Sequence, residues 1–458
     1  MQRRTKWNAS IVGVGLAVVL VTGACTSDRP TSTVSDPALP PASQASVEQI
    51  PQPVVVDLTV AQQSQRIDVA MPSFTEPANI TNPLFPILGQ ESVLQLGRVD
   101  GKPFRAEVAL MPDTRIIVWE SQRVETLVSQ YAAFLDGRLH EVAYDYYAQA
   151  DDGSVWYFGE DVFNFKGGAI INTHGTWIAG KDGPAAMIMP ADPRVGDVYR
   201  PENIPGFVFE EVTVQAVDQT FEGPFGPVQG GIVIDELHMD GAREQKSFAP
   251  GYGEFYVSTG GDVEATVLAL PSDALAEPIP TELATLRDGA DCVLQAAGSG
   301  DWSAAEATVQ ELSTAWKTHG SDQVHQLLKA QMDEALATLA GAVSARNAAT
   351  AQQAAIDVGR SSLDLQVPYR PIAEIELGRF DLWLAQLLLD ATAGDAKGVG
   401  GDLFTLDYLR DRIQHTLESE GVTAIHAQLE KLYGAGGSLA AAAKAAEQLR
   451  STIAQISP

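Results

Sequence analysis

The feature that most constrains this fold is a change of periodicity between residues 270 and 278. Before it, Asp-Gly pairs separate short runs in which apolar and polar residues alternate, and this period of two is typical of antiparallel strands joined by hairpins. After it, the composition shifts to Ala, Leu and Gln, and apolar residues recur every three or four positions, as on one face of a helix. The sequence therefore predicts an α+β protein of two domains, with strands first and helices second.

The β domain is predicted over residues 76–270. Asp-Gly pairs stand at 100–101, 136–137, 152–153 and 240–241, and the alternation is clear from Val142 to Gln149. Consecutive hairpins favour an antiparallel meander that curls into a sandwich or an open barrel. Five prolines between 184 and 206 predict a long irregular loop in that stretch.

The C-terminal domain, residues 278–458, is predicted to be an all-α helical bundle. One helical face holds Phe380, Trp383, Leu384, Leu387, Leu388 and Ala391, and another holds Val324, Leu328, Met332, Ala335, Leu339 and Val343. Six or seven helices with short connections and a four-helix core are expected, with Ser438 capping the last one. Because prolines and polar residues fill 262–280, we expect few contacts across it and two separable domains.

The N-terminus has the pattern of an export signal. Three basic residues precede an apolar run from Ile11 to Val21, which is too short to span a membrane comfortably. The run ends in Leu20-Val-Thr-Gly-Ala-Cys25, which resembles the lipobox of bacterial lipoproteins, although Thr22 stands where that family prefers Leu or Val. The resemblance implies that residues 1–24 are removed and that Cys25 is lipidated, which anchors the chain to the extracytoplasmic side of a membrane. A plain secretory signal with an incidental Cys is the alternative.

Residues 25–75 are expected to form a disordered tether, because the stretch after Cys25 is rich in Ser, Thr, Pro and Ala and has no apolar period. Beyond it, residues 80–258 contain four distinctive segments: Ile80-Thr-Asn-Pro-Leu-Phe-Pro, Asp151-Asp-Gly-Ser-Val-Trp-Tyr-Phe-Gly-Glu-Asp, Met189-Pro-Ala-Asp-Pro-Arg-Val-Gly-Asp-Val-Tyr-Arg and Ala249-Pro-Gly-Tyr-Gly. These segments resemble an uncharacterised family of bacterial secreted and lipoprotein β-domains. The resemblance implies a β fold and carries no activity.

Charge and cysteine content narrow the possible chemistry. The formal net charge is -29 and the pI is about 4.5. A surface this acidic repels nucleic-acid phosphates, so nucleic acid is not an expected partner. Cys25 and Cys292 are the two cysteines, and lipidation of Cys25 would exclude an intramolecular disulfide and any Cys-rich metal site.

Three sets of residues are candidates for a site. Asp407, Asp411 and His415 have the i, i+4, i+8 spacing of a metal-binding helix stripe, but they lie opposite Leu406 and Leu409, which favours a solvated face. Trp156 and Tyr157 either stack on a ligand or, as we favour, pack in the sheet. Arg370 and Arg379, which lie near Asp364, Glu374 and Asp381, either line a ligand pocket or, as we favour, form ion pairs.

Motifs for phosphate binding, zinc-dependent proteolysis and a nucleophile elbow are missing from the sequence, so we expect no enzyme and no cofactor. The prediction is a membrane-anchored lipoprotein of the cell envelope that acts as a non-enzymatic binding or scaffolding module, with another envelope protein or a small apolar ligand as partner. Two alternatives remain open. A large apolar cavity in the β domain would favour a carrier of lipid or another apolar ligand, and converging His, Asp and Glu side chains would favour a metal-binding bundle.

Overall fold

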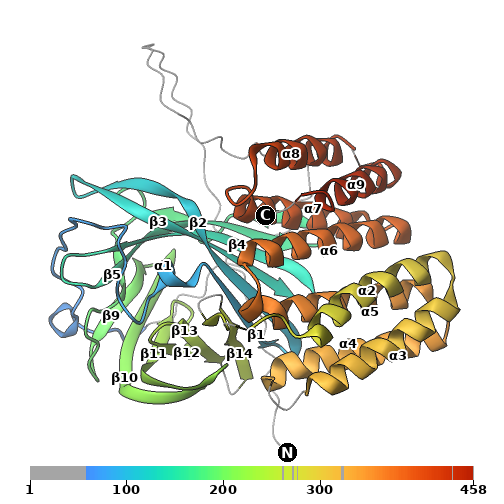
Figure 1. The fold of residues 1–458 in the computed structure, drawn as a ribbon. Coiled ribbons are helices and arrows are strands. Elements are labelled where there is room, and N and C mark those ends of the chain that lie inside the picture. The colour runs from blue at the N-terminus through green and yellow to red at the C-terminus, as the bar shows by residue number, and fades with distance from the viewer. Residues whose placement is uncertain are drawn as a thin grey trace, which may run out of the picture. The chain divides into compact units, whose positions relative to one another are not determined.

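The structure is a computed structural model that describes residues 58–259, 262–270, 273–275, 277–320, 324–435 and 437–456. Cys25, the leader and most of the expected tether lie outside these residues. Strands occupy the first part of the described chain and helices the second, which confirms the predicted α+β class (Figure 1).

The strands form one antiparallel sheet of 14 members. They are β1 (Ser92–Val99), β2 (Lys102–Trp119), β3 (Gln122–Leu135), β4 (Arg138–Gln149), β5 (Val155–Lys166), β6 (Ala169–Asn172), β7 (Trp177–Ile178), β8 (Ala186–Met189), β9 (Val198–Ile204), β10 (Val208–Gly223), β11 (Gly226–His238), β12 (Arg243–Ala249), β13 (Gly253–Thr259) and β14 (Asp262–Ala269). Their order is β6-β5-β4-β3-β2-β1-β14-β13-β12-β11-β10-β9, and β7 and β8 pair with β5. The first and last strands are therefore neighbours in the middle of the sheet.

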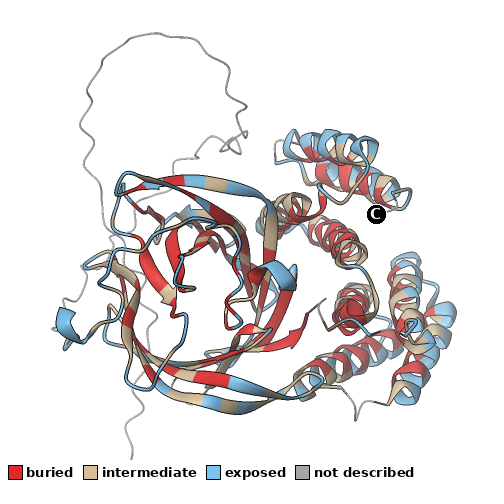
Figure 2. Ribbon diagram, turned by 60° about the vertical axis from the view of Figure 1, so that its left-hand side comes forward, coloured by how far each residue is buried: buried red, intermediate tan, exposed pale blue. Residues whose placement is uncertain are grey.

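The sheet curls until its two ends approach each other. β8 pairs with β5 near one end and lies beside β9 at the other end. Figure 2 shows the result as a nearly complete ring of strands with an inner and an outer face. The open, curled form of the β domain is therefore the one adopted, and the sandwich alternative is wrong because the described strands belong to one sheet.

The predicted hairpins are present where Asp-Gly pairs occur. Asp100 and Gly101 take φ values of 51° and 74°, and Asp136 and Gly137 take 54° and 71°, as a tight two-residue turn requires. The irregular loop predicted between 184 and 206 is wrong, because this stretch contains β8 and β9. Pro201 lies within β9, at the end of the strand order, where proline is tolerated because fewer backbone N–H groups are needed for pairing.

Eight helices follow the sheet in the described residues: α2 (Thr281–Ser299), α3 (Trp302–His319), α4 (Gln326–Ser344), α5 (Ala348–Gln366), α6 (Ile372–Ala393), α7 (Ala396–Ile413), α8 (Ser419–Tyr433) and α9 (Leu439–Ile453). Ser438 caps α9 as predicted, since its side chain accepts a hydrogen bond from the Ala441 N–H. None of the helices in the described residues has both the length and the apolar character needed to cross a membrane.

The helices pack on the outer face of the sheet and share two apolar cores with it (Figure 1). Leu94 and Leu268 of the sheet belong to the core of α2–α5, and Phe134 and Val142 belong to the core of α6–α9. α6 contributes to both cores. The expectation of few contacts between two separable domains is therefore wrong, because the helices bury their apolar side chains against the outer face of the sheet.

The segment 58–75 also belongs to the folded unit. The Ala61 N–H donates to Glu211 Oε1 at 2.8 Å, Arg66 pairs with Val198, and Ser73 Oγ donates to Asp151 Oδ2 at 2.7 Å. The tether predicted over 25–75 is thus too long at its C-terminal end.

Candidate functional site

A cavity of about 230 Å³ lies inside the curled sheet. Inward-facing side chains of β1–β4 and β8–β13 line it, and a short segment around α1 (Ile87–Gln90) closes one side with Phe85, Pro86 and Ile87. The polar and charged residues that line it are Gln90, Gln95, Ser129, Tyr131, Asp145, Tyr147, Glu210, Glu236, Lys246, Tyr252 and Glu254.

Two carboxylates that line the cavity, those of Glu210 and Glu236, converge with the imidazole of His238 beside it. Glu236 and His238 are two residues apart on β11, so they share its inner face, and the strand register places Glu210 of β10 opposite His238. The Nδ1 atom of His238 lies 3.3 Å from Glu210 Oε1, and its Nε2 atom lies 4.0 Å from Glu236 Oε2. In the described residues this is the one group of three whose ligand atoms converge as a metal would require, all within 4.8 Å of one another.

Lys246 is the cation that faces this wall from β12. Its Nζ atom lies 2.6 Å from Glu236 Oε2, 3.5 Å from Glu244 Oε2 and 3.8 Å from Glu254 Oε2. Burial alone would lower the pKa of Lys246, but the charges of these carboxylates hold it well above its usual range. The ammonium is therefore charged and shared among several acidic groups.

The acidic groups on this wall have unlike pKa values. Burial raises the pKa of Glu236 to about 8, and the charge of Glu210 adds to the effect. Burial also favours the neutral form of Glu210, but a hydrogen bond from His238 and the charge of Lys246 lower its pKa to about 2. Burial would lower the pKa of His238, yet its hydrogen bonds to Glu210 and Glu244 raise it to about 10. His238 and Glu210 thus form a charged pair beside a carboxyl group that burial tends to keep protonated.

Two further buried acidic residues lie on the inner face, Asp145 on β4 and Glu202 on β9, and the strand register places Glu202 directly opposite Glu210. The Tyr157 hydroxyl donates to Asp145 Oδ1 at 2.8 Å, and Trp177 Nε1 donates to Glu202 Oε1 at 3.2 Å. Burial raises the pKa of Asp145 to about 7, and burial followed by the charge of Glu210 raises that of Glu202 to about 8. The inner face therefore holds several carboxyl groups, and the negative charge of each one disfavours ionisation of its neighbours.

The two aromatic candidates have different partners. Tyr157 reaches the cavity wall through Asp145, and its ring stacks on Tyr147 with centroids 4.9 Å apart. Trp156 is also buried, with its Nε1 donating to Ser154 Oγ at 2.9 Å and its ring 6.1 Å from that of Trp119. Both side chains are buried in the same apolar core of the sheet, as the favoured interpretation expects, and Tyr157 contacts the lining residue Asp145 through its hydroxyl.

The helical candidates Asp407, Asp411 and His415 do not form one stripe. α7 ends at Ile413, so His415 lies exposed beyond it. Asp411 Oδ2 accepts a hydrogen bond from the Tyr144 hydroxyl of β4 at 2.9 Å, and Asp407 pairs with Arg410. The expectation that all three face solvent is wrong for Asp411, because α7 packs on the outer face of the sheet.

Arg370 and Arg379 take part in ion pairs. Arg370 Nη1 lies 2.8 Å from Glu374 Oε2, one helical turn away. Arg379 is buried between helices and sheet, where its guanidinium lies 2.6 Å from Glu376 and 3.2 Å from Asp364. This arrangement supports the ion-pair interpretation, and for Arg379 the pairs connect α5 and α6.

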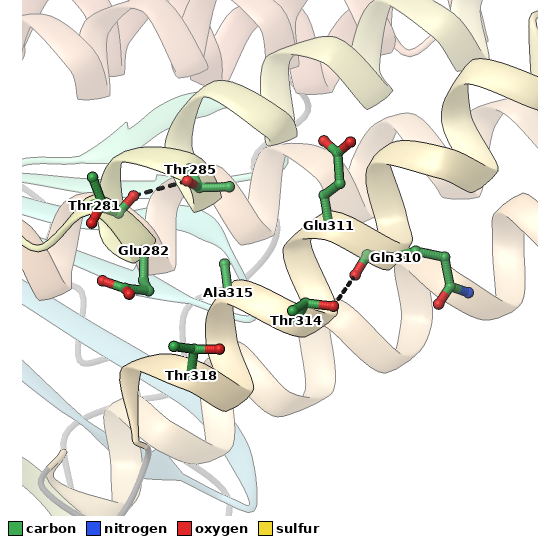
Figure 3. A pocket seen from close by; sticks show the side chains of 8 residues that line it. All are labelled: Thr281, Glu282, Thr285, Gln310, Glu311, Thr314, Ala315 and Thr318. Carbon is green, nitrogen blue, oxygen red and sulfur yellow. Dashed lines mark hydrogen bonds between the residues drawn. The ribbon is translucent and has the colours of Figure 1, made fainter.

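A wider groove of about 420 Å³ runs between α2 and α3, open to solvent (Figure 3). Two of its threonines, Thr285 and Thr314, donate to the backbone oxygens of Thr281 and Gln310 in their own helices, at 2.8 Å each. Such hydroxyls are already satisfied and direct no donor into the groove. The groove is a weaker candidate than the inner cavity, where charged side chains converge.

Sequence reasoning missed Glu210, Glu236, His238 and Lys246. A signal was present, because Glu236-Leu-His238 and Glu244-Gln-Lys246 flank the Asp240-Gly241 turn. In a hairpin these four charged residues share one face. What the sequence does not reveal is whether that face points into the ring or out to solvent.

Comparison with known proteins gives no further guidance, since the chain matches no protein-family model and no curated protein.

Proposed function

We propose that this chain is a lipid-anchored, extracytoplasmic binding protein that holds a small cationic ligand inside its curled sheet. The observation that carries the proposal is the composition of the cavity wall. Four acidic side chains line it, those of Asp145, Glu210, Glu236 and Glu254, against two cations, the lining ammonium of Lys246 and the imidazole of His238 that pairs with Glu210. A low-dielectric site with excess carboxylate favours a positively charged ligand.

The pKa values of the wall support this proposal. Burial and mutual repulsion raise the pKa values of Asp145, Glu202 and Glu236. A bound cation would lower them again, because an opposite charge nearby favours the ionised form. A bound cation would thus stabilise the ionised carboxylates of this wall.

The cavity size restricts the ligand to a small one. Ligand sites of drug-sized molecules usually measure about 300–1,000 Å³, and this cavity measures about 230 Å³. A lipid acyl chain also gains nothing from charged walls, which it would desolvate without replacement. The alternative of a lipid carrier therefore has less support than a carrier of a small polar cation.

Aromatic rings add a second recognition element. Tyr131, Tyr147 and Phe85 line the same cavity as the carboxylates. Aromatic faces attract ammonium groups by about 0.5–2 kcal/mol, depending on desolvation. We propose binding rather than catalysis, since carboxylates, tyrosines and one lysine in this arrangement suffice to recognise a cation.

The test compares cations with neutral molecules, and the ammonium ions and alcohols are matched in size. The secreted Cys25→Ala chain is titrated by calorimetry with small organic ammonium ions, with divalent metal ions, and with neutral alcohols of the same size as the amines. We expect at least one cation to bind and the alcohols not to bind. Glu254→Gln should weaken an ammonium ligand about tenfold, the loss of roughly one charge-assisted contact, whereas Asp113→Asn, on an exposed residue, should not. Equal binding of amines and alcohols, or none by any cation, would refute the proposal.

A further inference from the structure

We propose that Glu210, Glu236 and His238 form a binding site for a divalent transition-metal ion on the inner face of the sheet, an inference that rests on the proposed cation-binding function. The three residues come from the adjacent strands β10 and β11, so their backbone positions are set by the sheet register. Their ligand atoms already lie within 4.8 Å of one another. Small side-chain rotations would bring each to the distance of about 2.0–2.2 Å that metal–oxygen and metal–nitrogen bonds require.

A second observation points to a ligand at the same place. Tyr199 is 0% exposed, and its buried hydroxyl has no hydrogen-bond partner. The register pairs Val212 with Tyr199 on one side and with Glu236 on the other, so Tyr199 and Glu236 share the inner face of the sheet. Buried hydroxyl groups are almost always satisfied, and a water or other ligand bound to the metal would supply the missing partner of Tyr199.

Lys246 does not prevent metal binding. Its ammonium lies 2.6 Å from Glu236 Oε2, which a metal would need. However, Glu244 and Glu254 lie only 3.5 and 3.8 Å from the same Nζ atom. Lys246 can therefore turn to these carboxylates and keep its charge paired when Glu236 binds an ion.

The donor set decides the class of metal. Imidazole suits zinc, copper, iron and nickel, whereas calcium and magnesium prefer oxygen ligands alone. Once the metal has displaced the proton of His238 into solvent, its imidazole with the two carboxylates fits Zn²⁺ or Mn²⁺ and leaves at least one position open. Glu210 and Glu236 both line the cavity, so a second small ligand or water in the cavity would lie near the bound ion.

The test uses the full chain with Cys25→Ala and Cys292→Ser, so that no thiol competes for the metal. After removal of metals with a chelator, calorimetric titration with Zn²⁺ and Mn²⁺ should show one ion bound per chain, and Ca²⁺ should bind at least tenfold more weakly. His238→Gln and Glu236→Gln should each weaken Zn²⁺ binding at least tenfold. His415→Gln, which removes an exposed histidine elsewhere, should change nothing.

A second measurement needs no variant at the proposed site, so its outcome does not depend on whether such a variant folds. Anomalous diffraction at the zinc edge from crystals grown with Zn²⁺ should locate the ion between Glu210, Glu236 and His238. A zinc peak at another place, or no binding above that of His238→Gln, overturns the inference. If metals fail while an organic ammonium ion binds, the inference falls and the proposed function stands. If no cation binds, both fall.

Discussion

Glu107 lies on β2 among the buried ion pairs that connect the sheet to the helices. Its carboxylate is 2.7 Å from both Arg105 Nε and Arg412 Nη1 and 3.8 Å from Arg379 Nε. Burial alone would raise the pKa of Glu107, but these three guanidinium groups hold it well below its ordinary value of 4.5. A lowered folded-state pKa means that the pairs stabilise the fold above about pH 4.5 and that this stabilisation is lost as the pH falls further.

We therefore expect the free energy of unfolding to decrease below about pH 4.5, in part because of Glu107. Glu107→Gln should lower stability at neutral pH by about 3–5 kcal/mol, since it leaves buried guanidinium groups without a full partner. It should also flatten the acid side of the profile. Urea unfolding at a series of pH values checks this, with Glu306→Gln on an exposed residue as the control. An unchanged acid slope in Glu107→Gln would show that other carboxylates dominate.

The residues of the candidate site show what sequence alone can and cannot predict. Tyr157 was a candidate because aromatic and acidic residues cluster around it, and it does reach the cavity wall through Asp145. Arg379 was placed among ion pairs, but its contacts with Glu107 required knowledge that β2 lies beneath α6. Local patterns identify which residues share a strand face, whereas the partner of that face depends on contacts between segments far apart in the chain.

At the scale of single elements, the turn between β2 and β3 was not predicted. Glu120 and Ser121 take φ values of 47° and 67°, the same left-handed geometry as in the Asp-Gly turns. Nothing in a Glu-Ser pair signals this geometry, because side chains other than Gly, Asn and Asp rarely adopt it. The flanking β2 and β3 pair along most of their length and impose the turn.

This difference predicts two substitutions of opposite effect. Ser121→Gly should raise the free energy of unfolding by up to about 1 kcal/mol, because glycine relieves the left-handed conformation. Gly137→Ala should lower the free energy of unfolding by about 1 kcal/mol. This loss would come from backbone strain and not from a steric clash, since an added Cβ would meet nothing within 4 Å. Chemical denaturation measures both. Changes of the same sign would contradict this account of the turns.

α6 illustrates a second limit of periodicity. The predicted face of Phe380, Leu384 and Leu387 does lie in the core of α6–α9. Leu382, on another side of the helix, is also buried, in the core of α2–α5. A helix between two cores has no single apolar face, and a search for one face finds half of its contacts.

Leu382→Ala and Leu384→Ala should therefore destabilise the protein to a similar extent, by about 2–5 kcal/mol each. Leu388→Ala should destabilise the protein less than either of these, because Leu388 is only partly buried. Urea unfolding of the three variants provides the comparison. A Leu382→Ala variant as stable as the parent would mean that the core of α2–α5 does not bury this side of α6.

For the whole molecule, the shared cores predict that sheet and helices unfold together. Leu94 and Phe134 of the sheet are buried among helical side chains, so separating the two regions exposes both. In hydrogen exchange with mass spectrometry at increasing urea, peptides from β3 and from α5 should lose protection at the same midpoint. Two separate midpoints would restore the view of independent domains.

The proposed lipid anchor also concerns the whole molecule. We expect Cys25→Ala to move the protein from the membrane fraction to the soluble fraction, because lipid attached at Cys25 would be its means of stable attachment. Cys292→Ala, at the other cysteine of the sequence, should leave the protein with membranes. A Cys25→Ala chain that still fractionates with membranes would require another means of attachment.

The strand order has a consequence for how the chain reaches its native state. β1 leads outward to one end of the sheet, the chain crosses to the other end, and β14 returns to pair with β1. The central pairing is thus the strand pairing of greatest sequence separation among the described strands, and such pairings are slow to form because a long loop must close first. A chain emerging from its N-terminus displays β1 with one edge unpaired until β14 follows, and an unpaired edge invites association with other chains. The export that we propose for this protein should therefore depend on chaperones that shield β1 during that interval.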